Sequence, residues 1–438
     1  MEMIHLQLLK NAKESIYIEI YEMRNKEFQE EIFRALERGV LVNMVIEPDP
    51  VGNACDALSA KEKNDNPRCE ISQNFIDRFD DVVKKMSKKY ANKKVGLSKI
   101  RYYNKNLCNS NGTKNCFMHG KMIIVDESRV LLSTGNFNDT SFCDISIKNK
   151  NECRRDFSIL IQDDKKVAKF KEIFFLDFEH GTPCDIGPEK LKSGRPLSLT
   201  EERCQLQISK EKNVPIEKIS KEILQHLDKN MGMAKGEIFE ITVSPYSEKR
   251  MIDLIDSAKN KIQVQAQYIK VESWLKALLR ALERGVKVEI NLASLCHFYG
   301  KNGPSISYKD YHHEEGLFGK FINPLRFFDK NAAHIKFFIQ GVPYPHKGIG
   351  GYLHAKVFII DEKVAWIGST NGSEMSNSYN REYGVIFNNN KIVKELSHFV
   401  SQDFERSWSV EEHIPDPYGM DHHRKINSGA CLVHPGSK

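Results

Sequence analysis

The stretch MHGKMIIVD, residues 118–126, reads as a buried β-strand that carries two polar side chains. His119 and Lys121 lie two residues apart, so on a strand they point to the same face. A single histidine in such a run is usually a core residue with satisfied hydrogen bonds. However, a second stretch, LHAKVFIID at residues 353–361, repeats the same spacing of histidine, lysine and aspartate. The repetition favours a chemical role for both stretches.

The chain as a whole is a duplication. The sequence RALERGV occurs at residues 34–40 and again, unchanged, at residues 280–286, an offset of 246. Beyond a variable insertion the offset becomes 235, and it carries IRYY at 100–103 onto IKFF at 335–338. The offset of 235 also relates the two histidine-lysine stretches. Internal similarity at fixed offsets predicts two lobes with a common scaffold.

The pattern within each lobe predicts an α/β fold. Segments with apolar residues at helical spacing alternate with short apolar runs, as in EEIFRALERGV followed by LVNMVIE, and such alternation is typical of α/β layers. A stretch rich in proline, glycine and charge separates the lobes. We therefore expect a first lobe over residues 1–185, a linker with a helix over 186–235, and a second lobe with a C-terminal tail over 236–438.

Each histidine-lysine strand is expected to open a hairpin. The polar sequences DESR and DEK, which begin at Asp126 and Asp361, read as turns, and the apolar runs VLLSTGN and VAWIGSTN follow them. An extended strand rises about 3.3 Å per residue, so each aspartate lies at the far end of its hairpin from the histidine. Both aspartates are therefore expected to be structural.

The return strands are expected to bring polar groups beside each histidine. The converging residues are His119, Lys121 and Asn136 in the first lobe and His354, Lys356, Ser369 and Asn371 in the second. An ammonium group, a carboxamide and a hydroxyl suit a phosphate, and an imidazole suits proton transfer or covalent chemistry. Two such clusters around one phosphoryl group would supply a nucleophile and an acid without a metal.

These motifs resemble the repeated signature of the phospholipase D superfamily, H-x-K-x4-D-x6-G-S-x-N. Residues 354–371 match the signature at every position. Residues 119–136 match it except that Ser133 and Thr134 replace Gly-Ser, and Thr134 keeps the hydroxyl. The resemblance implies two pseudo-twofold-related α/β/α lobes with one active site at their interface. It also implies chemistry that requires no cofactor, with an accessory divalent ion as an open alternative.

The resemblance assigns roles to these residues. One histidine attacks phosphorus to form a phosphohistidine, and the other protonates the leaving oxygen and then activates water or an alcohol. Because the first motif of the family usually supplies the nucleophile, we expect His119 to attack and His354 to act as the general acid and base. The expected phosphate-binding residues are Lys121, Thr134, Asn136, Lys356, Ser369 and Asn371, of which the two lysines also count as catalytic. No residue is expected to bind a metal.

The family also has an acidic residue downstream of each motif that orients an imidazole. The candidates are Asp156 in RRDFSIL and Glu382 in NREYGVI, which align through the arginines that precede them. A carboxylate on one ring nitrogen fixes the tautomer and stabilises the imidazolium that forms. Which carboxylate serves which histidine is left open.

The resemblance to the phospholipase D superfamily leaves several substrate classes open, and composition does not choose among them. The 438 residues carry a net charge of +6, and no run approaches the 18 or more apolar residues of a membrane span. We expect a phospholipase D that hydrolyses the distal phosphodiester of glycerophospholipids to phosphatidic acid and a free head group, with or without transfer to an alcohol. The alternatives are a nuclease for single-stranded nucleic acid and a cardiolipin-synthase-type phosphatidyltransferase. No polybasic run of five or six residues favours long nucleic acid.

The cysteines predict the compartment. Eight of the ten lie in the first half of the chain, mainly in polar sequence such as CNSNGTKNC. This pattern favours local disulfides in an oxidising compartment. We therefore expect a secreted or otherwise exported protein whose targeting segment is not seen in this chain. The expected partner is a phospholipid at a membrane surface, with nucleic acid as the second choice. We expect a monomer, because one chain carries both half-sites.

Overall fold

The computed structural model describes residues 2–47, 67–91, 93–103, 117–139, 141–142, 154–181, 236–245, 247–293, 299–300, 303–304, 322–328, 332–338 and 352–409. The chain divides into two compact units. The first unit comprises Met1–Phe142, Ser158–Met231 and Tyr379–Tyr383, and the second comprises Cys143–Phe157, Gly232–Ser378 and Gly384–Lys438. Each unit thus contains a short segment from the other half of the sequence. We call Tyr379–Tyr383 and Cys143–Phe157 the exchanged segments.

The first unit is built on a six-stranded mixed sheet with the order β3-β2-β1-β4-β5-β7. Strands β1, β2 and β3 are parallel, whereas β4, β5 and β7 run antiparallel to their neighbours. The strands are β1 (Ser15–Ile20), β2 (Leu41–Ile46), β3 (Lys99–Tyr102), β4 (Lys121–Val125), β5 (Arg129–Ser133) and β7 (Ser158–Ile161). The helices are α1 (Glu2–Lys10), α2 (Lys26–Glu37), α4 (Pro67–Lys89), the 3-10 helix η1 (Lys94–Leu97) and α5 (Asp164–His180).

The second unit repeats this sheet and extends it at both edges, in the order β18-β13-β10-β9-β15-β16-β17-β8. Its strands are β8 (Phe239–Ser244), β9 (Lys261–Ala266), β10 (Lys287–Ala293), β13 (Ala333–Phe338), β15 (Lys356–Ile360), β16 (Val364–Gly368), β17 (Glu382–Phe387) and β18 (Trp408–Ser409). Two short pairs join β6 (Arg154–Arg155) with β14 (Tyr352–Leu353), and β11 (Tyr299–Gly300) with β12 (Gly303–Pro304). Its helices are α9 (Glu248–Asp256), α10 (Glu272–Glu283), α12 (Asn323–Phe328), α13 (Glu374–Ser378) and α14 (Asn390–Arg406).

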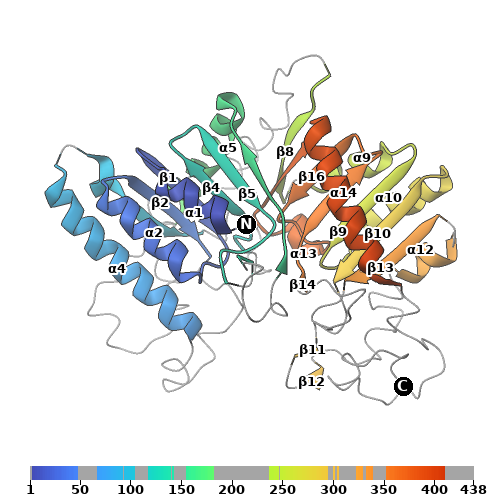
Figure 1. Ribbon diagram of the computed structural model, residues 1–438, viewed down its shortest axis with the longest axis horizontal. Coiled ribbons are helices and arrows are strands. Elements are labelled where there is room, and N and C mark those ends of the chain that lie inside the picture. Colours follow the sequence, from blue (N-terminus) through green and yellow to red (C-terminus); the bar gives the residue numbers. More distant parts are fainter. Residues whose placement is uncertain are drawn as a thin grey trace, which may run out of the picture. The chain divides into compact units, whose positions relative to one another are not determined.

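Helices cover both faces of the first sheet (Figure 1). Ile16 and Ile18 of β1 enter a core that α1, α2 and α4 close. Tyr17, between them, stacks on Phe174 of α5 with 5.1 Å between ring centroids. Successive side chains of a strand point to opposite faces, so α5 covers the other side. The predicted α/β/α layering of the first lobe is confirmed.

The second sheet is layered in the same way. Val264 of β9 packs in a core with α9, α10 and α12. Its neighbour Gln263 faces α14, where it accepts a hydrogen bond from Ser397 at 2.7 Å and donates one to Ser401 at 2.9 Å. None of the helices that the structure describes is long and apolar enough to cross a bilayer.

The repeated sequence RALERGV forms the end of one helix in each unit. The side chain of Asn25 accepts the Phe28 N–H at 2.7 Å and caps the start of α2. Gly39 follows the end of α2 with a φ of 84°, and Gly285 follows α10 with a φ of 82°. Only glycine adopts this conformation without steric cost. The repeat therefore fixes how each helix ends and how the next strand begins.

Both predicted hairpins are confirmed, and their turns match. Strand β4 pairs with β5, and β15 pairs with β16, both antiparallel. Positive φ angles of 50–54° occur at two successive residues in each turn, as in a type I′ turn; they are Asp126, Glu127, Asp361 and Glu362. This turn follows the natural twist of the two strands, which keeps the return strand in register.

The turn aspartates fasten each hairpin to the neighbouring strand. The carboxylate of Asp126 accepts the N–H groups of residues 13–15 at distances of 2.8–3.1 Å. Asp361 accepts those of residues 259–261 at 2.7–2.9 Å. Burial raises the pKa of Asp361, but these three donors outweigh burial, and its pKa is lowered overall. These contacts support a structural role for both aspartates.

The sequence between the lobes lies outside the described residues, as do the cysteine side chains. Only the helical backbone at Cys69 is described. The expected disulfides and the linker helix therefore stay predictions.

Candidate active site

The backbone around His119 is held by the exchanged segment of the first unit. The His119 N–H donates to the Arg381 carbonyl at 2.9 Å, and the Arg381 N–H donates to the Phe117 carbonyl at 2.9 Å. The strand expected over residues 118–126 begins only at Lys121. Its first residues take backbone partners from the exchanged segment instead of from the sheet.

The same segment supplies the carboxylate that holds His119. The Nδ1 atom of His119 lies 2.9 Å from Oε2 of Glu382, which is fully buried. The other oxygen, Oε1, accepts a hydrogen bond from the Asn380 amide at 3.2 Å. A carboxylate at Nδ1 fixes the proton there, so that Nε2 carries the lone pair.

His354 has an equivalent arrangement in the second unit. The backbone N–H of His354 donates to the Arg155 carbonyl at 3.0 Å, and the ring atom Nδ1 lies 2.9 Å from Oδ1 of Asp156. Burial and the nearby charge of Lys356 lower the pKa of His354 well below its usual range, although Asp156 opposes them. A neutral imidazole with its lone pair on Nε2 is the form that the site favours. The pairing that the sequence left open is therefore Glu382 with His119 and Asp156 with His354.

The two motif lysines lie against the histidines that precede them. Lys121 and Lys356 are each about 1% exposed. Each Nζ donates to the backbone carbonyl of the histidine two residues earlier, His119 or His354. A buried ammonium group beside an imidazole supplies the positive charge that a phosphoryl group requires.

Asn136 is held by a residue that the motif pattern does not include. Its amide donates to Oε2 of Glu22 at 2.9 Å, and the amide of Asn138 donates to the same oxygen at 3.1 Å. The carboxylate of Glu22 also forms an ion pair with Arg24. Glu22 thus orients the amide group that is expected to bind phosphate.

The remaining motif positions are all buried. Thr134, Ser369 and Asn371 are between 0% and 8% exposed. Ser133, which stands where the family signature has glycine, accepts hydrogen bonds from the Gly135 N–H at 3.0 Å and the Ser158 hydroxyl at 3.1 Å. The departure from the signature in the first motif is accommodated by these two contacts.

Two further residues near His119 were not predicted. The Tyr21 ring lies 4.7 Å from the His119 ring, centroid to centroid. Glu47 accepts the Met118 N–H at 2.7 Å through Oε2. Tyr21 and Glu47 come directly after β1 and β2, and the carboxyl ends of parallel strands are where sites form in open α/β sheets. That position is the signal that could have identified them.

A buried ionic cluster surrounds the exchanged segment of the first unit. The Arg381 side chain lies 2.9 Å from the Asp177 carboxylate, and the Tyr383 hydroxyl donates to Asp177 at 2.8 Å. Burial and the charge of Asp177 raise the pKa of Glu19 well above its usual range. Burial raises the pKa of Asp177 as well, although Arg381 opposes it. The cluster fixes the residues on both sides of Glu382.

The second unit has a simpler version of this cluster. Arg155 lies 3.0 Å from Asp403, and the Gln265 amide donates to Asp403 at 3.0 Å. Gln265 occupies the position of Glu19 in the repeat, and Phe157 occupies that of the tyrosine. The Arg155 side chain is 35% exposed. Within the described part of the chain, no three His, Cys, Asp or Glu side chains are grouped so that they could hold a metal ion.

Both lobes match one known protein family. The model of the cardiolipin synthase, PLD-like domain family matches residues 5–177 and 251–408, which include both motifs and both hairpins. The chain belongs to the phospholipase D superfamily. The predicted membership is confirmed at this level, and the protein is a phospholipase D superfamily enzyme.

Curated relatives of this superfamily member match only part of it. Cardiolipin synthase 1 of Staphylococcus epidermidis is 24% identical over 184 residues, which are 42% of this chain and 32% of that protein. The chain therefore matches about one third of the length of this relative.

A solved structure supports the phospholipase D fold. Phosphatidylserine synthase of Haemophilus influenzae Rd KW20 superimposes with a TM-score of 0.63 at 14% sequence identity. The match covers 94% of this chain and 86% of the other. At this identity the similarity establishes the architecture.

Proposed function

We propose that this superfamily member is a phosphatidyltransferase, which moves a phosphatidyl group from a phospholipid to a small alcohol through a phosphohistidine. Water is the competing acceptor and gives phosphatidic acid. Transfer takes precedence over the hydrolysis expected from the sequence because both relatives above are named as synthases. Hydrolysis is the side reaction of the same covalent intermediate.

The observation that carries this proposal is the pair of matching histidine-carboxylate contacts. Each Nδ1 atom lies 2.9 Å from a buried carboxylate, on Glu382 for His119 and on Asp156 for His354. Each imidazole therefore offers Nε2 to a substrate, and its carboxylate stabilises the cation that forms. Two imidazoles so prepared, each with a buried lysine beside it, suit double displacement at phosphorus.

In the first displacement, Nε2 of one histidine attacks phosphorus and forms a P–N bond. The P–O bond to the head group breaks, and the leaving oxygen takes a proton from Nε2 of the other histidine. Lys121, Lys356 and the amides of Asn136 and Asn371 neutralise and orient the non-bridging oxygens. The hydroxyls of Thr134 and Ser369 are assigned to the same task.

In the second displacement, the acceptor alcohol gives its proton to the histidine that acted as acid. The alcohol oxygen then attacks phosphorus, and the P–N bond breaks to restore the first histidine. The same two groups thus serve in both directions, because the acid of one step is the base of the next.

The cellular setting is part of the proposal. We propose that the enzyme is exported to an oxidising compartment, as the cysteine pattern indicates, and works at a membrane surface as a monomer. No nucleic-acid substrate is proposed, because no observation on the described residues favours one.

The test uses vesicles of phosphatidylglycerol with ethanolamine as acceptor, and mass spectrometry of the lipids. We expect phosphatidylethanolamine and phosphatidic acid with wild type, and loss of both with His119→Ala or His354→Ala. Incubation with single-stranded DNA runs in parallel. Release of phosphatidic acid without transfer would leave a phospholipase D, and DNA cleavage with inert vesicles would overturn the lipid assignment.

A further inference from the structure

A surface rich in exposed lysines lies on the first unit, at the end of α4 and the turn that follows it (Figure 1). Residues 84–99 contain seven lysines, all of them exposed, and no aspartate or glutamate. We call these seven the lysine face: Lys84, Lys85, Lys88, Lys89, Lys93, Lys94 and Lys99. Because the whole chain has a net charge of +6, the rest of the chain carries −1. The lysine face thus accounts for the basic character of the protein.

The fold gathers lysines that the sequence separates. They come as three pairs and a single residue, so no continuous basic run marks them. A Cβ atom at Gly96 of η1 would lie 3.0 Å from Cβ of Ser87 of α4, so η1 packs closely against this helix. The ammonium groups of Lys89 and Lys93 lie 4.9 and 4.7 Å from the ring centroid of Tyr90. The lysines of α4 and those of the turn therefore form one surface.

The carboxylates near the lysine face leave its charge uncompensated. The acidic residues of α4 all precede the lysines, and the last of them is Asp81. Glu127, on which the charge of Lys94 acts, is itself paired with Lys171. Across the described ranges, no carboxylate forms an ion pair with any lysine of this face. The positive charge is therefore available to an anionic partner.

The stability of the fold explains few of these lysines. Cations in the last turn of a helix interact favourably with the helix dipole, but only Lys88 and Lys89 lie in the last turn of α4. The duplication offers a second comparison. At the offset of 235, residues 319–334 correspond to residues 84–99, and their three basic residues and one aspartate give a net charge of +2 instead of +7. The common scaffold of the lobes therefore does not require the lysine face.

An exposed leucine lies among the lysines. Leu97 is the most exposed of the large apolar side chains that the structure describes, at 62%. A phospholipid bilayer suits both features, because anionic head groups attract the lysines and an apolar side chain can enter the boundary with the acyl chains. Nucleic acid is the weaker match. All seven cations are lysines, whereas arginine is the residue that binds phosphate through two hydrogen bonds.

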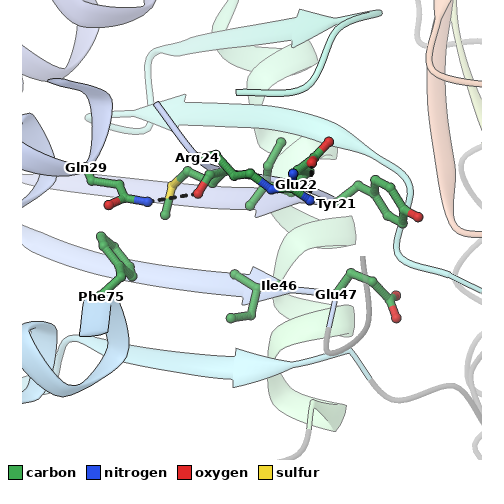
Figure 2. A pocket seen from close by; sticks show the side chains of 9 residues that line it. Tyr21, Glu22, Arg24, Gln29, Ile46, Glu47 and Phe75 are labelled. Atoms are coloured by element: carbon green, nitrogen blue, oxygen red, sulfur yellow. Dashed lines mark hydrogen bonds and ion pairs between the residues drawn. The ribbon is translucent and has the colours of Figure 1, made fainter. Parts of the chain in front are cut away.

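The lysine face is distant from the motif residues of its own unit. It lies at the amino end of β3, whereas Tyr21 and Glu47 follow the carboxyl ends of β1 and β2, as Figure 2 shows. His119 lies at that second end, where its ring contacts Tyr21. The six residues of β2, at about 3.3 Å each, separate the two ends of the sheet by about 20 Å. Binding at the lysine face can therefore be measured separately from chemistry at His119.

We propose that the lysine face and Leu97 dock this enzyme on the surface of an anionic phospholipid bilayer. The inference rests on the proposed function, which places the enzyme at a membrane, and it identifies the part of the chain that binds there. The lysines are attracted by the negative surface potential, and Leu97 enters the head-group layer. Each lysine near such a surface strengthens binding about fivefold, and salt screens the attraction.

The first experiment measures co-sedimentation with vesicles of phosphatidylcholine alone or mixed equally with phosphatidylglycerol. Every protein carries His119→Ala, so that the lipids are not consumed. We expect binding to the mixed vesicles only, and its loss at high salt. Lys84→Gln, Lys85→Gln, Lys88→Gln and Lys89→Gln together should weaken binding about 100-fold or more. No binding of the His119→Ala protein to the mixed vesicles, or a loss below threefold in the quadruple variant, would overturn the proposal.

A matched control removes four exposed lysines of the second unit, through Lys259→Gln, Lys363→Gln, Lys391→Gln and Lys394→Gln. Both quadruple variants have a net charge of +2, so they differ in where the charge is lost and not in how much. We expect the control to bind the mixed vesicles within about threefold of the His119→Ala protein. A loss as large as that at the lysine face would assign the binding to general charge and overturn the proposal.

The second experiment tests the choice of a lipid surface over nucleic acid. Leu97→Ser removes the apolar side chain and keeps every lysine. We expect it to weaken binding to the mixed vesicles about tenfold, because less apolar surface enters the bilayer. Unchanged binding would overturn the part assigned to Leu97. Binding of single-stranded DNA that depends on the lysine face, without binding of vesicles, would assign the face to nucleic acid and overturn the bilayer assignment.

These measurements separate the docking surface from the proposed transfer. Vesicle binding that depends on the lysine face, combined with no phosphatidyl transfer by wild type, would support the docking surface and count against the proposed function. Transfer by wild type, combined with equal vesicle binding by both quadruple variants, would support the proposed function and overturn the docking surface.

Discussion

The two units carry corresponding motifs at equivalent strands, but the residues that support the motifs differ. In the first unit Arg381 is fully buried against Asp177, with the buried Glu19 in the same cluster. In the second, Arg155 is 35% exposed, and Gln265 stands in place of the glutamate. The duplication has kept the histidine, lysine and asparagine of each motif and changed the residues behind them. Residues that both lobes keep therefore indicate the shared chemistry, and residues that differ indicate how the lobes divide the work.

The largest loss of activity is expected at the two carboxylates that orient the histidines, Glu382 and Asp156. Glu382→Gln and Asp156→Asn each remove the charge that stabilises an imidazolium. We expect each variant to lose about 10³–10⁴-fold in kcat for lipid transfer, as when a histidine is held in the wrong tautomer. Glu382→Asp and Asp156→Glu, which retain the charge, are the matched controls and should retain more activity. A large loss in only one of the pair would mean that one unit alone does the chemistry.

Replacement of the buried Arg381 is expected to give the next largest effect, a loss of stability. Arg381→Met leaves Asp177 buried without its cation, which costs about 3–5 kcal/mol of unfolding free energy. Arg155→Met should cost less, because the Arg155 side chain is 35% exposed and the buried Asp403 keeps its hydrogen bond from the Gln265 amide. Urea unfolding followed by tryptophan fluorescence measures both. Equal losses would contradict the structural difference between the two clusters.

The turn aspartates, Asp126 and Asp361, allow a test of a feature that the two units share. Asp126→Ala and Asp361→Ala each remove an acceptor for three backbone N–H groups, and we expect each to cost about 1–2 kcal/mol. The pKa of Asp361 is lowered in the folded state, so its contribution is present above the unfolded pKa of about 3.9 and disappears as pH falls. The difference between wild type and Asp361→Ala should therefore narrow in acid. A difference that is constant from pH 7 to pH 3 would argue against the carboxylate as acceptor.

The smallest effect is expected for Glu19→Gln, which places the residue of the second unit in the first. Below about pH 4.3, where the Glu19 side chain is neutral like glutamine, the two proteins should differ by no more than about 1 kcal/mol in unfolding free energy. The pKa of Glu19 is raised in the folded state, so its stabilising contribution is present below the unfolded pKa of about 4.3. It is lost as pH rises through the raised value. Compared with wild type, Glu19→Gln should become relatively more stable as pH increases, and parallel pH profiles would exclude a shifted Glu19.

Much of this architecture could be predicted from local sequence. The repeat offsets placed the lobes' equivalent strands, and the turn sequences at Asp126 and Asp361 placed the hairpins. The crossed pairs of His119 with Glu382 and His354 with Asp156 could not be predicted, since each joins residues about 200 or more apart and depends on the exchanged segments.

Two residues that contact the first motif, Glu22 and Glu47, were missed for a different reason. Glu22 and Glu47 have no counterparts of their own type in the second lobe, so a search for repeated residues passes over them. The predicted start of β4 was three residues too early, because the apolar run continues upstream of Lys121 into residues that pair with the exchanged segment. Periodicity detects what a segment resembles but not which distant segment it pairs with.

The exchanged segments also determine what would happen if the chain were divided. A cut between residues 182 and 235 gives an N-terminal fragment with His119 and Asp156 and a C-terminal fragment with His354 and Glu382. The carboxylate that contacts the histidine of one fragment therefore lies in the other fragment. We therefore expect neither fragment to orient its imidazole on its own, and we expect activity only from the two fragments together.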